Sequence, residues 1–325
     1  MRVVASASPS LALVKYWGKL SGGTNLPATP SLAVTLDGLR TTTTVTESDG
    51  GDEVLIAGTR QPLDSFAPVI DAFRSRSGSS ATVRVESANT FPTAAGIASS
   101  SSGFAALTLA LNAFYRTDLS PTELSATARV GSGSASRAVF GGFTVWPAGA
   151  EAASPLLPAD HWPELRVVVV LIHTGSKPVS SRDGMRRTAE TSPIYARWCE
   201  ESPSLFARAV DALRRHDAES LGTAMRESYL FMFSTMFTTR PPVIYWLPES
   251  VAVIRAADAM RAAGTPVWET MDAGPQVKLL TTSGHVETVA AAVHDAVPDA
   301  RILVAAPGGE PEVVVEETRR PGGTS

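Results

Sequence analysis

Cysteine is almost absent from this sequence of 325 residues, which contains only Cys199. A single cysteine excludes an intramolecular disulfide framework and any metal site built from several thiolates. Cys199 itself is interpreted as a packing residue, because a free cysteine behaves as a small hydrophobic side chain. No apolar run reaches the length of a transmembrane helix, and the N-terminal MRVVASASPSLALVKYWGK has no uninterrupted signal-type apolar core. We therefore expect a cytoplasmic protein with no membrane partner.

A large excess of one charge is also lacking, since the formal net charge is -4. So small a charge argues against a nucleic-acid partner, and it means that any anionic ligand must be held by a local basic cluster. Individual lysine and arginine positions are therefore informative. The hydrophobic content of 44% is enough to bury the core of one large domain or two moderate ones.

The common nucleotide-binding fingerprints are missing from the Gly/Ser-rich stretch FPTAAGIASSSSGF. No Gly-Lys-Ser/Thr follows its glycine, which excludes the Walker A pattern, and it does not match the dinucleotide fingerprint. Its position still favours a binding site, because ATVRVES predicts a strand before it and Phe104, Leu107, Leu111 and Phe114 predict a helix after it. Backbone N–H groups at such a helix start can hold a phosphate. A linker or an ordinary serine N-cap remains the alternative.

The rest of the chain mixes strand and helix patterns, which predicts an α+β fold class. The turn-rich stretch WPAGAEAASPLLPADHWPE is the best candidate boundary. We place an N-terminal domain at 1–164 and a C-terminal domain at 165–310. Residues 311–325 are expected to form a flexible tail.

Several other stretches carry charged side chains. LALVKYWGK places Lys15, Tyr16 and Lys19 on or just after an apolar strand, and GSGSASR places Arg137, whose planar fork suits carboxylate or phosphate, in a second Gly/Ser loop. Solvated lysines and a plain loop are the alternatives. The stretch SKPVSSRDGMRRT adds Lys177, Ser180, Ser181, Arg182, Arg186 and Arg187. If these groups converge they form an anion pocket, but the sequence alone does not establish that they do.

Asp272 lies in TMDAGPQVK, at a turn between two predicted strands. A plain aspartate turn is the alternative. Beside lysines and arginines the pKa of this carboxyl would be lowered, so that it stays ionised and could accept a proton from a substrate hydroxyl.

Together these stretches resemble the diphosphomevalonate decarboxylases, a branch of the GHMP kinase superfamily. The matching segments follow the family order: LALVKYWGK, LPATPSLAVTLD, NTFPTAAGIASSSSGFAAL, GSGSASRAVFGGF, VSSRDGM, PPVIYW and MDAGP. The resemblance implies the GHMP kinase fold, with an N-terminal ATP-binding domain like domain 2 of ribosomal protein S5 and a ferredoxin-like C-terminal domain. It also implies ATP and Mg²⁺, a site between the domains, and a homodimer.

The resemblance also assigns residues. Asp272, Lys19 and Arg137 match the catalytic set. The pocket for mevalonate 5-diphosphate matches Tyr16, Lys19, Ser132, Ser134, Arg137, Ser181, Arg182 and Met185. The ATP site matches Asn89, Pro92, Ala95, Gly96, Ala98, Ser99 and Ser100, with Ser100 as the candidate contact to the metal. Ser101 and Ser102 are expected only to pack and cap the helix.

The implied reaction is ATP-dependent decarboxylation of (R)-mevalonate 5-diphosphate to isopentenyl diphosphate in the mevalonate pathway. A 3-hydroxy acid has no electron sink for loss of CO2, so the tertiary hydroxyl must first be phosphorylated to leave. Asp272 would orient or deprotonate that hydroxyl, Lys19 would stabilise the transferring phosphoryl group, and Arg137 would hold the carboxylate. The alternatives are a decarboxylase of mevalonate 5-phosphate, a mevalonate 3-kinase, and a non-catalytic regulator that binds nucleotide or isoprenoid.

Four positions depart from the family pattern. Ser10 and Gln276 stand where asparagine is usual, Phe233 stands where a Met-His pair is frequent, and PATPS replaces a loop that more often contains Asn-Ser or Asn-Asp. These departures bear on fine substrate preference and on packing. They leave the aspartate, lysine and arginine set intact.

Overall fold

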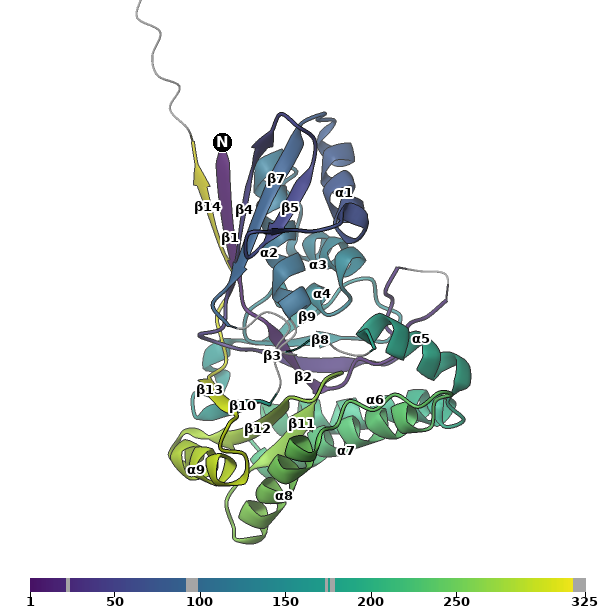
Figure 1. The fold of residues 1–325 in the computed structure, drawn as a ribbon, viewed down its shortest axis with the longest axis vertical. Coiled ribbons are helices and arrows are strands. Elements are labelled where there is room, and N and C mark those ends of the chain that lie inside the picture. Colours follow the sequence, from purple (N-terminus) through teal and green to yellow (C-terminus); the bar gives the residue numbers. More distant parts are fainter. Residues whose placement is uncertain (22–23, 92–98, 173–174, 176–178, 318–325) are drawn as a thin grey trace, which may run out of the picture.

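The computed structural model describes residues 1–21, 24–91, 99–172, 175 and 179–317. Within these residues the strands form three sheets (Figure 1). The largest has the order β14-β1-β4-β7-β5-β6, and its pairings are antiparallel except between β5 and β7. Its strands are β1 (Arg2–Ala7), β4 (Thr41–Ser48), β5 (Glu53–Ile56), β6 (Thr59–Arg60), β7 (Thr82–Asn89) and β14 (Glu312–Glu316).

The helix that follows the Gly/Ser-rich stretch covers this sheet. α2 (Ser99–Tyr115) packs on β1 and β4 and buries the four residues of its predicted apolar stripe. The predicted strand and helix are confirmed as β7 and α2, and residues 92–98 between them lie outside the described residues. The neighbouring helices are α1 (Ala67–Ser77), α3 (Pro121–Gly131) and α4 (Ala135–Ala138).

Two four-stranded sheets complete the fold. One has the order β2-β3-β8-β9, with β2 (Ser10–Val14), β3 (Ser31–Thr35), β8 (Phe143–Trp146) and β9 (Ser154–Leu157). The other has the order β11-β12-β10-β13, with β10 (Leu165–Leu171), β11 (Trp268–Met271), β12 (Val277–Thr282) and β13 (Arg301–Ala305). A turn at Asp37 and Gly38 joins β3 to β4, so it carries the chain from one sheet to another.

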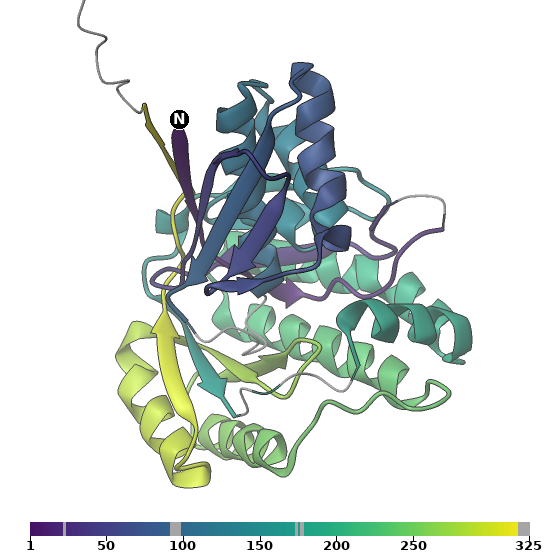
Figure 2. The ribbon, with the colours of Figure 1, turned by 45° about the horizontal axis from the view of Figure 1, so that its top comes forward.

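After residue 164, two long helices, α6 and α7, lie side by side. They pack against strands β2 and β3 of the β2-β3-β8-β9 sheet, which we call the middle sheet (Figure 2). The α-helices in the described part of this half are α5 (Ser181–Thr191), α6 (Tyr195–Arg214), α7 (Ala218–Phe237), α8 (Pro248–Ala262) and α9 (Val286–Ala296). In the described part of the chain, no helix is both long enough and apolar enough to cross a bilayer.

The predicted domain boundary lies directly before β10, yet the hydrophobic core crosses it. Leu11 and Leu13 of β2 belong to the same buried cluster as Val167 of β10, Leu213 of α6 and Met225 of α7. Burial of apolar surface is the dominant favourable contribution to folding. The middle sheet is therefore stabilised by both halves of the chain.

The prediction of a flexible tail is wrong for Glu312–Glu316, because these residues form β14 and pair with β1 (Figure 1). The preceding residues also bind the N-terminal half: the N–H of Gly142 donates to the carbonyl of Gly308 at 2.8 Å, and the N–H of Gly308 donates to the carbonyl of Thr35 at 2.8 Å. The polar and Gly/Pro-rich composition suggested disorder, but the VVV core of β14 supplies an edge strand. Residues 318–325 lie outside the described residues.

Gly18 is predicted to tolerate no side chain. Its φ is +111°, and a Cβ atom there would lie 2.0 Å from the hydroxyl oxygen of Tyr195. We expect Gly18→Ala to lower the free energy of unfolding by roughly 1–3 kcal/mol, measured by chemical denaturation. Gly58→Ala is the matched control, because Gly58 also has a positive φ but nothing within 4 Å of the added atom. Equal losses in both variants would show that Tyr195 is irrelevant.

Candidate active site

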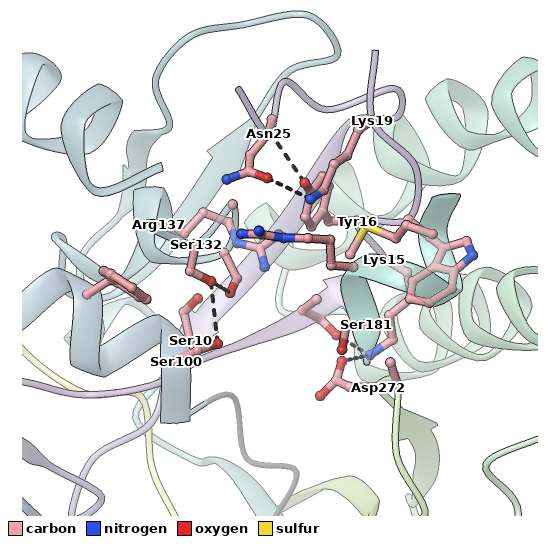
Figure 3. A pocket seen from close by; sticks show the side chains of 18 of the residues that line it. Ser10, Lys15, Tyr16, Lys19, Asn25, Ser100, Ser132, Arg137, Ser181 and Asp272 are labelled. Atoms are coloured by element: carbon pink, nitrogen blue, oxygen red, sulfur yellow. Dashed lines mark hydrogen bonds and ion pairs between the residues drawn. The ribbon is translucent and has the colours of Figure 1, made fainter. Parts of the chain in front are cut away.

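A cavity of about 330 Å³ lies where the two halves of the chain meet (Figure 3). β2 and the segment after it form one side, and the start of α2 and the connection between α3 and α4 form another. The start of α5, a methionine of α7 and the turn after β11 complete the wall from the C-terminal half. The sequence-predicted residues that line it are Tyr16, Lys19, Ser100, Ser132, Ser134, Arg137, Ser181, Arg182, Met185 and Asp272.

A second cavity, of about 530 Å³, adjoins the first along α2. Asn89 and Ser99 line it, and Ser100 and Phe104 line both cavities. Ser100 therefore belongs to the walls of both cavities. The predicted nucleotide residues Pro92, Ala95, Gly96 and Ala98 lie outside the described residues, as does Lys177.

The four consecutive serines, 99–102, fall into a buried pair and a pair that lines the cavities. Ser101 and Ser102 are fully buried. The hydroxyl of Ser101 donates to the carbonyl of Ser134 at 3.0 Å, and the hydroxyls of Ser102 and Thr41 are 2.6 Å apart. The prediction that this pair packs is confirmed, whereas Ser99 and Ser100 face the cavities.

Asp272 is held by an ammonium group on each carboxylate oxygen. The Nζ atom of Lys15 lies 2.8 Å from Oδ1, and the Nζ atom of Lys278 lies 3.0 Å from Oδ2. Burial opposes ionisation of Asp272, but the charges of the two lysines outweigh it and hold the pKa of the carboxyl well below its usual range. Its side chain remains 27% exposed, on the cavity wall. The expected ionised aspartate is present, and it has room to meet a ligand.

Lys15 contacts Asp272, whereas the sequence analysis gave the catalytic role to Lys19. The Nζ atom of Lys15 also donates to the carbonyl of Ala12 at 2.8 Å, and burial lowers the pKa of Lys15 to about 8. Lys19 instead donates to Oδ1 of Asn25 at 2.6 Å (Figure 3). Burial, with the nearby charge of Arg182, lowers the pKa of Lys19 to about 8.

Arg137 places a positive charge on the wall of the cavity. Its side chain is buried, and its Nη1 donates to the hydroxyl of Ser31 at 2.5 Å. Its Nε has no hydrogen-bond partner among the described residues. Burial lowers the pKa of Arg137 to about 10, opposed by the charge of Asp272, so the guanidinium is still charged at neutral pH. A buried, incompletely paired cation favours an anionic ligand.

Tyr16 also lines the cavity. Its hydroxyl donates to the carbonyl of Asn25 at 3.4 Å. A Cβ atom on Gly133 would lie 2.5 Å from the same hydroxyl, which explains a glycine in the GSGSASR loop. Asn25 in turn donates through Nδ2 to the carbonyl of Arg129 at 2.8 Å. This asparagine thus fixes both Tyr16 and Lys19, and the sequence analysis missed it.

Not every predicted basic residue converges on the cavity. Arg186 and Arg187 of α5 are not among its lining residues, and Arg186 pairs with Glu190 at 3.0 Å. Lys278 was overlooked, although a lysine inside the apolar run of β12 is an unusual pattern that could have revealed it. A charge in a buried strand requires a partner.

The structure shows the contacts of the four positions that depart from the family pattern. Oε1 of Gln276 accepts from the N–H of Ile172 at 2.5 Å, and Phe233 is fully buried with its ring 5.4 Å from that of Trp246. These two serve packing. Ser31, which ends the PATPS stretch and begins β3, accepts the hydrogen bond of Arg137. Ser10 is buried on the cavity wall, and its hydroxyl has no partner in the described part of the chain.

Comparison with known proteins places this geometry in a family. Residues 7–156 match the diphosphomevalonate decarboxylase-like N-terminal domain, and residues 167–318 match the mevalonate 5-diphosphate decarboxylase C-terminal domain. Diphosphomevalonate decarboxylase mvd1 of Aspergillus fumigatus is 35% identical over 90% of this chain and 80% of its own length. The human diphosphomevalonate decarboxylase is 35% identical over 91% of this chain and 80% of its own length.

Similar solved structures belong to the same family as these sequence relatives. The mevalonate diphosphate decarboxylase of Staphylococcus aureus superimposes with a TM-score of 0.91 at 34% identity, covering 97% of this chain and 98% of its own. The complex of MDDEF with MVAPP, AMPPCP and magnesium gives a TM-score of 0.90 at 36% identity, covering 97% and 99%. The predicted α+β class and GHMP kinase fold are confirmed. The chain belongs to the diphosphomevalonate decarboxylase family.

Proposed function

We propose that the protein decarboxylates (R)-mevalonate 5-diphosphate in an ATP-dependent reaction that forms isopentenyl diphosphate, ADP, phosphate and CO2. The observation that carries this proposal is the ionised carboxylate of Asp272 near Arg137, in a cavity that shares the lining residue Ser100 with a second cavity. The carboxylate of Asp272 can receive a proton from a hydroxyl, and the guanidinium of Arg137 can hold a substrate carboxylate. The substrate and the nucleotide would meet between the two cavities.

The second cavity fits a nucleotide by its size and its chemistry. About 530 Å³ lies within the range usual for small-molecule sites. Its lining includes Ser99 and Ser100 at the start of α2, and the N–H groups of a helix start favour phosphate. ATP with Mg²⁺ would supply the phosphoryl group that turns the 3-hydroxyl into a leaving group. Ser100 is the residue we assign to the metal-bound phosphates.

The residues of the first cavity would divide the work on the substrate. Asp272 would orient the 3-hydroxyl and accept its proton, because the carboxylate is ionised and partly exposed to the cavity. Arg137 would bind the substrate carboxylate through its incompletely paired guanidinium. Lys15 would remain on Asp272. This contact of Lys15 with Asp272 adds a lysine to the site, and Lys19 keeps the role that the resemblance assigns to it.

The diphosphate would lie at the other end of the cavity. The cavity that holds Asp272 is also lined by hydroxyl groups and cations: Tyr16, Ser132, Ser134, Ser181, Arg182 and Lys19. Hydroxyl donors and fixed cations are the groups that bind phosphate oxygens. Met185 packs against the same wall. Their number favours a diphosphate over a monophosphate.

We further infer that the protein acts in the cytoplasm as a homodimer. The single cysteine, Cys199, suits a reducing compartment. Dimers with twofold symmetry are the commonest assemblies of soluble proteins, and the family resemblance points the same way. Light scattering of the purified protein measures the assembly directly.

The proposed reaction is tested by incubating the protein with Mg²⁺, ATP and one of three substrates: mevalonate, its 5-phosphate or its 5-diphosphate. We expect equal amounts of ADP and CO2 with the 5-diphosphate and little turnover with the other two. ADP without CO2 would identify a 3-kinase. No turnover with any of the three would reject the enzymatic function.

Asp272→Asn tests the role of the carboxylate. The amide has nearly the same shape but accepts no proton, so we expect kcat to fall by roughly 10²–10⁴-fold. ATP affinity, measured by calorimetry, should stay within about threefold of the wild-type value. A variant that keeps a tenth of the wild-type kcat would remove Asp272 from this role.

The pKa of Lys19, lowered to about 8, predicts a pH dependence of substrate binding. Lys19 loses its positive charge as the pH rises through 8, so the affinity of the free protein for mevalonate 5-diphosphate should fall between pH 7 and 9.5. Lys19→Arg keeps its charge over this range and should abolish most of that loss, as measured by calorimetry. An equal loss in Lys19→Arg would place the titrating group at Lys15.

A further inference from the structure

Lys278 is a charged side chain placed in the interior of the C-terminal sheet. It lies on β12, opposite Thr270 of β11 and Val169 of β10, and it is 1% exposed. Burying an ammonium group is unfavourable unless an anion compensates it. The carboxylate of Asp272 supplies that compensation, with Oδ2 at 3.0 Å from the Nζ atom. Lys278 does not itself line the substrate cavity.

Asp272 therefore has a different cation on each oxygen, and the two cations come from different sheets. Lys15 follows β2 of the middle sheet and contacts Oδ1, whereas Lys278 belongs to the C-terminal sheet and contacts Oδ2. The charged groups that face Asp272 from the surrounding elements are Lys15, Lys278 and, from α4, Arg137. Among the described residues, the carboxylate of Asp272 thus faces the cations of Lys15, Lys278 and Arg137. It is thereby suited to stay ionised while one edge remains open to the cavity.

We propose that Lys278 is a positioning residue for the decarboxylation: by holding Oδ2 it keeps the Asp272 carboxylate ionised and turned toward the substrate cavity. This inference rests on the proposed function. Lys15 alone would leave Oδ2 unpaired and the carboxylate free to rotate about its side-chain bonds. With both oxygens held, the carboxylate plane is fixed by side chains from two different elements.

The physical consequence concerns the acid side of the pH profile. An opposite charge within about 4–6 Å lowers the pKa of a carboxyl by about 1–3 units. Removal of the Lys278 charge leaves the opposing effect of burial in place and takes away one of the two compensating cations. The pKa of Asp272 should then rise, and the enzyme should lose activity at a higher pH than the wild type does.

The test uses Lys278→Met, which keeps the length and apolar body of the side chain, and Lys278→Gln, which keeps a hydrogen-bond donor without the charge. We expect kcat at pH 7 to fall about tenfold or more and the acid limb of the kcat profile to move up by about one pH unit or more in both variants. KM for ATP and for mevalonate 5-diphosphate should change less than about threefold, since Lys278 touches neither cavity.

Thr270→Val is the matched control. Thr270 is the cross-strand neighbour of Lys278, is equally buried, and its hydroxyl has no hydrogen-bond partner in the described part of the chain. This variant should keep the wild-type pH profile. An unmoved acid limb in whichever Lys278 variant folds, or an equal shift in Thr270→Val, would overturn the proposal.

A titration that does not need turnover separates this inference from the proposed function. In protein labelled with ¹³C at aspartate carboxyls, the Asp272 signal is assigned by its loss in Asp272→Asn. Its pKa should rise in Lys278→Gln and stay unchanged in Thr270→Val, whether or not the wild type turns over substrate. An unchanged Asp272 titration in Lys278→Gln would reject the positioning role, and inactivity of the wild type alone would reject the reaction.

Discussion

The pairing of one carboxylate with two buried ammonium groups is the interaction on which the site depends. Asp272 connects Lys15 of the N-terminal half to Lys278 of the C-terminal sheet, so the contact bridges the two halves at the cavity. Removal of one partner from such a cluster leaves an uncompensated buried charge, which is strongly destabilising. The same charges keep Asp272 ionised. Assembly of the two halves and the chemistry of the cavity thus rely on the same side chains.

The segment that follows β2 shows how closely the halves are joined. The N–H of Lys15 donates to the hydroxyl of Ser228 on α7 at 2.9 Å, and Nε1 of Trp198 on α6 donates to the carbonyl of Trp17 at 2.9 Å. Tyr195 fills the space above Gly18. A stretch of the N-terminal half that carries ligand-facing residues is therefore held by helices of the other half. A rigid support of this kind fixes the distance between substrate-binding groups and Asp272.

Local patterns predicted the elements well, because each depends on nearby residues. The apolar stripe of α2 and the strand-turn-strand around Asp272 were visible as periodicity and turn chemistry. Partners distant in sequence were not visible: the contact of Lys15 with Asp272 spans 257 residues. The family resemblance supplied the residues of the cavity, but it could not say which lysine touches Asp272. β14 was missed because a three-residue apolar run in a polar tail gives too little pattern.

The account requires the 3-hydroxyl of the substrate to lie beside Asp272, with the phosphate groups of the nucleotide beyond Ser100. A crystal structure of this protein with mevalonate 5-diphosphate, a non-hydrolysable ATP analogue and Mg²⁺ measures both positions. We predict the hydroxyl oxygen within 3.2 Å of an Asp272 carboxylate oxygen, the limit of an ordinary hydrogen bond, and the substrate carboxylate on Arg137. A complex in which the diphosphate, rather than the hydroxyl, occupies the space beside Asp272 would contradict it.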